Sequence, residues 1–152
     1  MFVVNLRKCL KVFKDVYVSS DSEQILEIAR LAGAKTILRG EELCGEIPNI
    51  PVYQHALRHM HGVDGIIAVQ ANSPTIDLEV IKKVKKHMES GIREIMTCHP
   101  NGQIYGSVWA ISKDKLLNYG DPFKPTPDLW VIDSSTDIHT SQDYELALKS
   151  YN

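Results

Sequence analysis

The sequence predicts an α/β fold: a three-layer sandwich with helices on both faces of a mainly parallel sheet. Over most of the chain, short β-prone apolar runs alternate with segments whose apolar residues recur at helical spacing. Several of the strand-like runs are continuously apolar, as is typical of strands buried on both faces. With 152 residues, 43% of them hydrophobic and 24% charged, the chain is expected to form one domain over residues 1–152.

The first half of the chain should supply three helices and three strands. In order, we expect a helix over 5–14, a strand over 16–18, a helix over 20–32, a strand over 35–38, a helix over 52–60 and a strand over 65–69. Ser20 and Glu23 have the spacing of a capping box, and Gly33 is placed to end that helix with a positive φ. The apolar face of the helix would consist of Ile25, Ile28, Ala29 and Ala32.

The second half continues the alternation. In order, we expect a turn over 72–75, a helix over 77–89, strands over 94–98 and 104–111, a short helix over 113–117, a strand over 130–132 and a closing helix over 141–150. The tripeptide Pro100-Asn101-Gly102 predicts a turn between the two middle strands.

Charge and composition exclude several classes of protein. The formal net charge is -2, which gives no electrostatic reason to expect binding to nucleic acid or to an anionic membrane. No apolar run approaches the length of a membrane span, and the charged N-terminus does not resemble a signal peptide. Three cysteines without CxxC spacing favour reduced, buried thiols in a cytoplasmic protein.

Two polar segments follow predicted strands, where ligands bind in sheets of this type. In the first, Gln70, Asn72 and Ser73 could bind the edge of a base or a sugar, or could form a turn that satisfies its own backbone. In the second, Asp137 and His139 point to one side of an extended chain and could hold a cation. Thr140 and Asp143 explain the rest of that segment as a capping box.

Two further sets of residues have alternative interpretations. Arg39 ends a predicted strand and could pair with an anionic ligand or with the neighbouring Glu41 and Glu42. The histidines His55, His59 and His61 lie within one predicted helix and its end, where they could chelate zinc or form a solvated polar face.

Taken together, these blocks resemble the acylneuraminate (CMP-sialic acid) cytidylyltransferase family and its relative, CMP-Kdo synthetase. The resemblance rests on VYVSSDSEQILEIARLAGAKTILRGEEL, HALRHM, VQANSP, PNGQIYG and STDIHTSQDYELAL, which occur in the family's order and span about 12–149. It implies a Rossmann-like nucleotidyltransferase fold and transfer of CMP from CTP to a sialic-acid-like or Kdo-like sugar acid, as in sialic acid biosynthesis.

The resemblance also implies roles for individual residues. Arg39 and Gln70 would face the substrate, and Asn72 and Ser73 belong to the same substrate-binding turn. Asp137 would be a ligand of Mg²⁺, with His139 in place of the family's second aspartate. Because Mg²⁺ prefers oxygen ligands, we expect it to be bound weakly here. No residue is assigned as catalytic.

Two of the family's segments have no counterpart in this sequence. One is the N-terminal strand with the glycine-rich loop that wraps the CTP phosphates, since the first glycine here is Gly33. The other carries sugar-acid contacts and the dimerisation arm. We therefore expect a fold truncated at its N-terminus. The gap left in the sheet would be closed by direct pairing of 16–18 with 66–69, by Met1 to Val4, or by a second molecule in a homodimer.

The sequence leaves three alternative functions. The first is a cytidylyltransferase that is weak or inactive as a lone chain. The second is a non-catalytic protein, which binds a nucleotide or sugar or serves as a partner subunit of a complete enzyme, and the third is a zinc module built on His55, His59 and His61.

Overall fold

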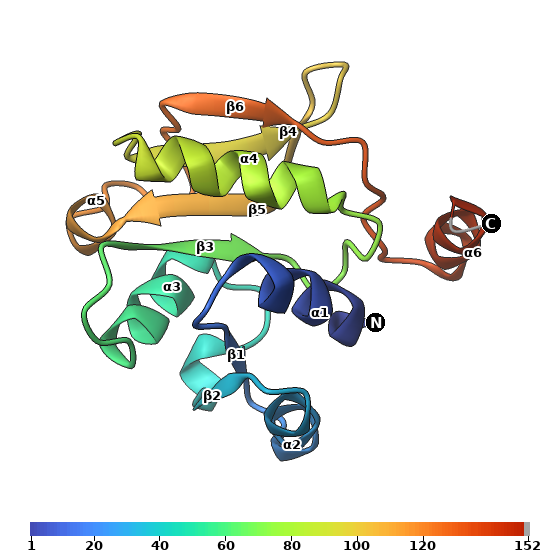
Figure 1. Ribbon diagram of the computed structural model, residues 1–152, viewed down its shortest axis with the longest axis horizontal. Coiled ribbons are helices and arrows are strands. Elements are labelled where there is room, and N and C mark those ends of the chain that lie inside the picture. The colour runs from blue at the N-terminus through green and yellow to red at the C-terminus, as the bar shows by residue number, and fades with distance from the viewer. Residues whose placement is uncertain (151–152) are drawn as a thin grey trace.

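The computed structural model describes residues 1–150, and its elements follow the predicted order closely (Figure 1). The helices are α1 (Phe2–Val12), α2 (Glu23–Leu31), the 3₁₀ turn η1 (Glu41–Leu43), α3 (Asn49–Arg58), α4 (Leu78–Glu89), α5 (Lys113–Leu117) and α6 (Ser141–Ser150). The strands are β1 (Tyr17–Ser20), β2 (Lys35–Leu38), β3 (Gly65–Val69), β4 (Glu94–Cys98), β5 (Ile104–Ser112) and β6 (Leu129–Ile132).

The strands form two separate sheets. One has four strands in the order β3-β5-β4-β6, and the other pairs β1 with β2 in parallel. In the larger sheet β4 and β6 are parallel, and β5 runs antiparallel to both of its neighbours, β3 and β4. Strands β3, β4 and β6 therefore share one direction, so the predicted mainly parallel α/β architecture is confirmed. The Pro100-Asn101-Gly102 turn joins β4 to β5 as expected, with Gly102 at φ +85°.

Helices cover both faces of the larger sheet, and β5 illustrates why its sequence is continuously apolar. On one face Val108 and Ala110 pack in a cluster with Ile81 and Val84 of α4. On the other face Trp109 and Ile111 pack with residues of α3 such as Tyr53. Successive residues of a strand point to opposite faces, so a strand covered on both faces needs apolar residues throughout.

The start of α2 differs from the prediction. Its N-cap is Ser22, whose hydroxyl accepts a hydrogen bond from the Ile25 amide at 3.3 Å, so the capping box at Ser20 and Glu23 was wrong. Ser20 is the last residue of β1, and its hydroxyl accepts instead from the Ser22 amide. The helix therefore begins two residues later than the capping box implies.

The buried face of α2 is shifted in the same way. Leu26 and Ala29 are its buried residues, whereas Ile28, predicted on the apolar face, is 46% exposed. Gly33 does follow the helix with φ +99°, as predicted.

The N-terminal segment does not close the sheet. Met1 is the N-cap residue of α1, and Phe2 to Val4 belong to that helix, so the alternative in which Met1 to Val4 fill the gap in the sheet was wrong. Leu6 and Cys9 are buried on one side of α1, and this burial favours the helix over a strand. Within residues 1–150, β1 does not pair with β3 either. No helix in the described part of the chain is both long enough and apolar enough to cross a membrane.

Candidate functional site

The two polar segments singled out in the sequence meet beyond the ends of β3 and β6. The Asn72 side-chain amide donates to Asp137 Oδ1 at 2.5 Å, and the Ile138 amide donates to the Asn72 carbonyl at 2.9 Å. The Thr136 amide also donates to Thr75 Oγ1 at 2.7 Å. Strands β3 and β6 point the same way, so both segments leave the sheet at the same edge, where α/β sheets bind ligands.

Helix α1 holds the first of these segments in place. The Asn5 side-chain amide donates to the carbonyls of Gln70 and Ser73, at 2.7 and 3.0 Å. Lys8 Nζ donates to the carbonyls of Pro74 and Ile76, at 2.6 and 2.7 Å. Burial lowers the pKa of Lys8, an effect that Asp77 partly offsets. Helix α1 therefore holds the backbone of residues 70–76 in place at the site.

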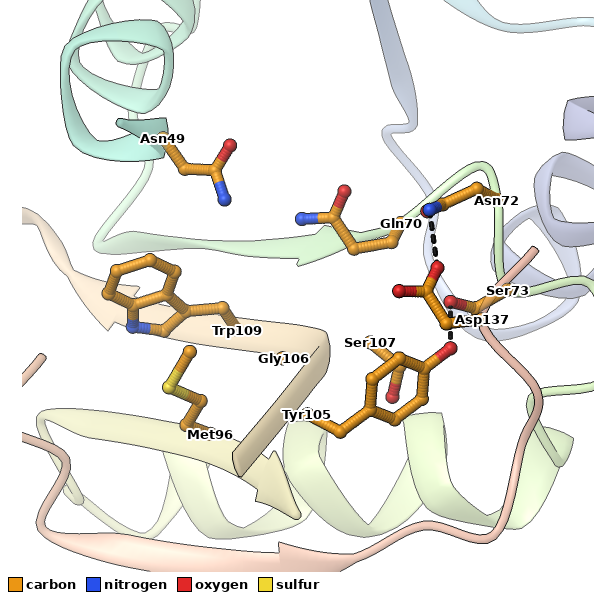
Figure 2. A pocket seen from close by; sticks show the side chains of 10 residues that line it. All are labelled: Asn49, Gln70, Asn72, Ser73, Met96, Tyr105, Gly106, Ser107, Trp109 and Asp137. Atoms are coloured by element: carbon orange, nitrogen blue, oxygen red, sulfur yellow. Dashed lines mark hydrogen bonds between the residues drawn. The ribbon is translucent and has the colours of Figure 1, made fainter. Parts of the chain in front are cut away.

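A cavity of about 210 Å³ lies against these segments (Figure 2). Its lining residues come from α3, β4, β5 and the two polar segments: Asn49, Gln70, Asn72, Ser73, Met96, Tyr105, Gly106, Ser107, Trp109 and Asp137. Strand β5 supplies Tyr105, Ser107 and Trp109, which are spaced two apart and therefore face the same side. Neither lysine nor arginine occurs among these lining residues.

The amide groups of Asn49 and Gln70 extend into the same space, above Trp109 (Figure 2). Gln70 Nε2 donates to the Tyr53 hydroxyl at 3.1 Å, which orients the amide so that its oxygen can accept from a ligand. Burial raises the pKa of Tyr53 well above its ordinary value, so this phenol is neutral. The site therefore offers neutral donors and acceptors beside an aromatic surface.

Ser73 lies at the wall of the cavity but is only 1% exposed. Its hydroxyl is hydrogen-bonded to the Tyr105 hydroxyl, and the Tyr105 ring stacks on His99 with ring centroids 4.4 Å apart. Burial raises the pKa of Tyr105, so its hydroxyl also stays protonated at neutral pH. In this geometry Ser73 orients Tyr105.

A buried polar network supports the wall of the cavity at Ser107. Asp133 is 2% exposed and accepts hydrogen bonds from the hydroxyls of Ser107 and Ser135. Ser107 is joined in turn to the Thr97 hydroxyl at 2.8 Å. Since buried polar groups need partners, this network fixes the rotamer of Ser107 and rigidifies the wall that carries it.

Asp137 and His139, the residues predicted to hold a cation, do not fit a resident Mg²⁺. One Asp137 oxygen accepts from Asn72, and the other is 2.5 Å from His139 Nε2. Mg²⁺ requires several oxygen ligands in octahedral geometry, and here one carboxylate is already engaged on both oxygens. Within residues 1–150, no group of three or more His, Cys, Asp or Glu side chains could hold a metal ion. The capping box beside it is present, since Thr140 and Asp143 exchange hydrogen bonds.

The three histidines His55, His59 and His61 form no such group either, within residues 1–150. The rings of His55 and His59 lie 4.7 Å apart, and His59 Nδ1 is 3.0 Å from the His55 carbonyl. Burial lowers the pKa of His55. The described residues therefore provide no geometry for the zinc module.

Arg39 does not line this cavity. It lies on a second, larger groove of about 480 Å³ between β1 and β3, which shares Asn49 and Gln70 with the cavity. In the part of the chain that the structure describes, no ion pair joins Arg39 to Glu41 or Glu42, and Arg39 Nε is buried without a hydrogen-bond partner.

Sequence reasoning missed six residues of the cavity: Asn49, Met96, Tyr105, Gly106, Ser107 and Trp109. The alternation of Tyr105, Ser107 and Trp109 along one strand was a usable signal for three of them. No sequence signal pointed to Asn49, because its place in the site depends on how α3 packs against the sheet.

Comparison with solved structures places the chain in the nucleotidyltransferase fold found in cytidylyltransferases. A CMP:2-keto-3-deoxy-manno-octonic acid synthetase complexed with CTP matches with a TM-score of 0.71 and 15% identity, covering 99% of this chain and 87% of that one. A cytidylyltransferase from Leptospira borgpetersenii serovar Hardjo-bovis matches with a TM-score of 0.70 and 17% identity, covering 100% of this chain and 76% of that one.

A third structure is Rv0371c from Mycobacterium tuberculosis H37Rv, solved as a complex with manganese. It matches with a TM-score of 0.71 and 13% identity, covering 98% of this chain and 85% of that one. No protein-family model and no curated protein matches the sequence. At these identities the likeness establishes the fold.

Proposed function

We propose that this chain is a cytidylyltransferase-like protein of the CMP-sugar-acid synthetase type that binds its ligand in the cavity but transfers CMP weakly or not at all as a lone chain. Its ligands would be CTP or CMP and a sialic-acid-like or Kdo-like sugar acid, in the cytoplasm. The observation that carries the proposal is the chemistry of the cavity: amides, hydroxyls and an aromatic surface surround one carboxylate, with no lysine or arginine among its lining residues.

Such a lining suits the hydroxyl and amide groups of a sugar or nucleoside, which form hydrogen bonds with neutral partners. It does not suit a triphosphate. Phosphoryl transfer is stabilised mainly by cations and backbone N–H groups aimed at the phosphate oxygens. Each missing donor of that kind typically costs about 2.7–4 kcal/mol of transition-state stabilisation. Asp137, the one charged group, would repel phosphate unless a cation arrived with it.

Mg²⁺ would therefore reach the site together with a nucleotide and be held weakly, with Asp137 as its protein ligand. We assign no step of CMP transfer to this ion, because the donors around it are too few.

Calorimetric titration of the full chain with CMP, CTP, N-acetylneuraminic acid and Kdo tests the proposal. We expect CMP or one of the sugar acids to bind, and CTP to bind no more tightly than CMP. Gln70→Ala should weaken binding about fivefold to tenfold, the loss of one or two hydrogen bonds. The control is Gln54→Ala, which removes an amide bonded to the Leu116 carbonyl and outside the cavity lining.

Two results would overturn the proposal. One is CTP binding to the lone chain far more tightly than CMP, which would require phosphate-binding groups that the cavity lacks. The other is equal loss of binding in Gln70→Ala and Gln54→Ala, which would place the ligand elsewhere.

A further inference from the structure

The formal charge at the candidate cavity is negative. Asp137 is the only aspartate, glutamate, lysine or arginine among the lining residues that the structure describes. Its side chain is 32% exposed, so the carboxylate is partly shielded from water. Asn72 Nδ2 and His139 Nε2 each lie 2.5 Å from one of its oxygens. These contacts hold the carboxylate at the wall of the cavity, and its oxygens keep further lone pairs for a donor on a ligand.

A second carboxylate lies directly behind that wall. Asp133 is 2% exposed and accepts hydrogen bonds from the hydroxyls of Ser107, which lines the cavity, and of Ser135. These donors are neutral, and no ion pair joins Asp133 to any of residues 1–150. Lys8 interacts electrostatically with Asp133, but its Nζ donates to two backbone carbonyls and lies outside the cavity lining. The charge of Asp133 is therefore compensated only in part.

Both carboxylates act on the same part of the cavity wall. Burial raises the pKa of Tyr105 most, and the charges of Asp137 and Asp133 raise it further, although hydrogen bonds with two serine hydroxyls act in the opposite direction. A third carboxylate, that of Glu94, is paired with Lys115 at 2.7 Å, so its charge is balanced. A group that enters the cavity beside Tyr105 therefore meets a negative potential.

The neutral part of the lining also suits a positively charged group. The rings of Tyr105 and Trp109 line the cavity (Figure 2), and the faces of aromatic rings attract ammonium groups. The side-chain amides of Asn49 and Gln70 carry oxygens that can accept from an N–H donor. An ammonium group has three donors and no acceptor, so one carboxylate and two amide oxygens can satisfy it.

We propose that the cavity selects a sugar or nucleoside that carries an amine at the end that enters it, with the ammonium group placed against Asp137. Opposite charges attract more strongly where they are partly shielded from water than at an exposed surface. The same charges disfavour a carboxylate or phosphate at that end, so a sugar acid would bind with its carboxylate directed out of the cavity. This preference rests on the proposed function only for the class of ligand, a sugar or nucleoside, and for its place in the cavity.

An ammonium group makes fewer demands on Asp137 than Mg²⁺ does. Mg²⁺ requires near-octahedral coordination by oxygen, and Asp137 is the one carboxylate that lines the cavity. A protonated amine needs only hydrogen-bond acceptors, which need not surround it in a fixed geometry. The donor set that is too small for a resident metal ion is therefore sufficient for an amine.

Two series of ligands that differ in charge at one position test the proposal. The first consists of N-acetylneuraminic acid, its methyl amide and its 2-aminoethyl amide. The second consists of CMP, cytidine and 5′-amino-5′-deoxycytidine. The full chain is titrated calorimetrically with each compound in the presence of EDTA at about pH 7.5, where histidine is mostly neutral and an aliphatic amine is protonated.

We expect the amine to bind about tenfold more tightly than the neutral compound in at least one series, and the acid or phosphate to bind no more tightly than the neutral compound. Asp137→Asn should remove most of the preference for the amine. The matched control is Glu27→Gln, which also removes one negative charge but lies on the surface of α2, where Glu27 is 61% exposed and pairs with Arg30. In the unmodified chain, raising the salt concentration from about 20 mM to about 500 mM should weaken the preference, a readout that needs no variant to fold.

Four results would overturn the proposal. Two leave the proposed function standing: tighter binding of the acid or phosphate than of the amine, and equal binding of the amine and the neutral compound, in both series. A preference for the amine that is as large in Asp137→Asn as in Glu27→Gln, or that does not respond to salt, would place the amine away from this carboxylate. If no member of either series bound, both the preference and the proposed function would be wrong.

Discussion

Removing the positive charge beside the buried carboxylate of Glu94 should destabilise the protein strongly. The Glu94 side chain is fully buried, and Lys115 Nζ lies 2.7 Å from its Oε2. Three neutral groups also donate to the carboxylate: Trp109 Nε1 at 2.9 Å, the Tyr119 hydroxyl at 2.5 Å and the Thr126 hydroxyl at 3.3 Å. Trp109 lines the candidate site, so this cluster supports the wall of the cavity.

Breaking a buried ion pair by removing one partner typically costs about 3–5 kcal/mol, because the remaining charge is left uncompensated. For Lys115→Met we expect the lower end, about 3 kcal/mol. Three neutral donors still hold the carboxylate, and the Lys115 side chain is 19% exposed, so water already reaches the pair. A loss of that size lowers the folding equilibrium constant by roughly a hundredfold.

Urea unfolding followed by tryptophan fluorescence measures this loss directly. The matched control is Lys82→Met, because Lys82 pairs with Glu79 at 3.2 Å on the surface, with side chains 50% and 74% exposed. An exposed pair of this kind contributes about 0–1 kcal/mol. If Lys115→Met and Lys82→Met lose the same free energy of unfolding, the reasoning about the buried carboxylate is refuted.

Three further predictions concern the site, the closing helix and a core thiol. Asn72→Asp should place a second carboxylate against Asp137, lower the stability of the metal-free chain and raise its affinity for Mn²⁺ at least tenfold by calorimetry. Hydrogen bonds from Thr140 and from backbone amides lower the pKa of Asp143. The stability that this carboxylate gives α6 should therefore be complete above its ordinary pKa near 3.8 and be lost as the pH falls through the lower folded-state value, seen by hydrogen exchange in α6. Burial raises the pKa of Cys9 to about 11, so at pH 8 the native protein should expose two thiols to Ellman's reagent and urea should expose the third.

For each of these three predictions, one result would contradict the reasoning. Unchanged Mn²⁺ affinity in Asn72→Asp would mean that Asp137 is not positioned to share a cation. Protection of α6 that stays constant down to pH 2 would show that Asp143 does not cap it. Rapid modification of all three thiols in the native protein would mean that α1 does not bury Cys9.

Local patterns predicted the strands best. The runs at β2 and β3 were assigned to the residue. At β3 the reason is plain, because the continuous apolar run GIIAV lies between the polar residues Asp64 and Gln70. The errors came where tertiary structure overrides a local pattern. Ser20 has capping spacing, but it belongs to β1, and α2 begins only after that strand ends. Met1 to Val4 were one of three alternatives for filling the gap in the sheet, but Phe2 to Val4 belong to α1, whose buried face includes Leu6.

The candidate site was predictable in part, for the same reason. Gln70, Asn72 and Asp137 were expected at one edge of the sheet because they follow strands of the same direction. The contact between Asn72 and Asp137 could not be predicted, because it depends on how the residues after β6 fold back across the edge of the sheet. Arg39 was grouped with these residues by resemblance, and the structure places it on the neighbouring groove.

The most direct test of the central claim is pyrophosphate release from CTP by the lone chain, with Mg²⁺ and a panel of sialic-acid-like and Kdo-like sugars. A chain that binds the neutral part of its ligand in a cavity without lysine or arginine among its lining residues should release pyrophosphate at the rate of the protein-free control. Robust turnover by the purified chain, lost in Asp137→Ala, would contradict the account.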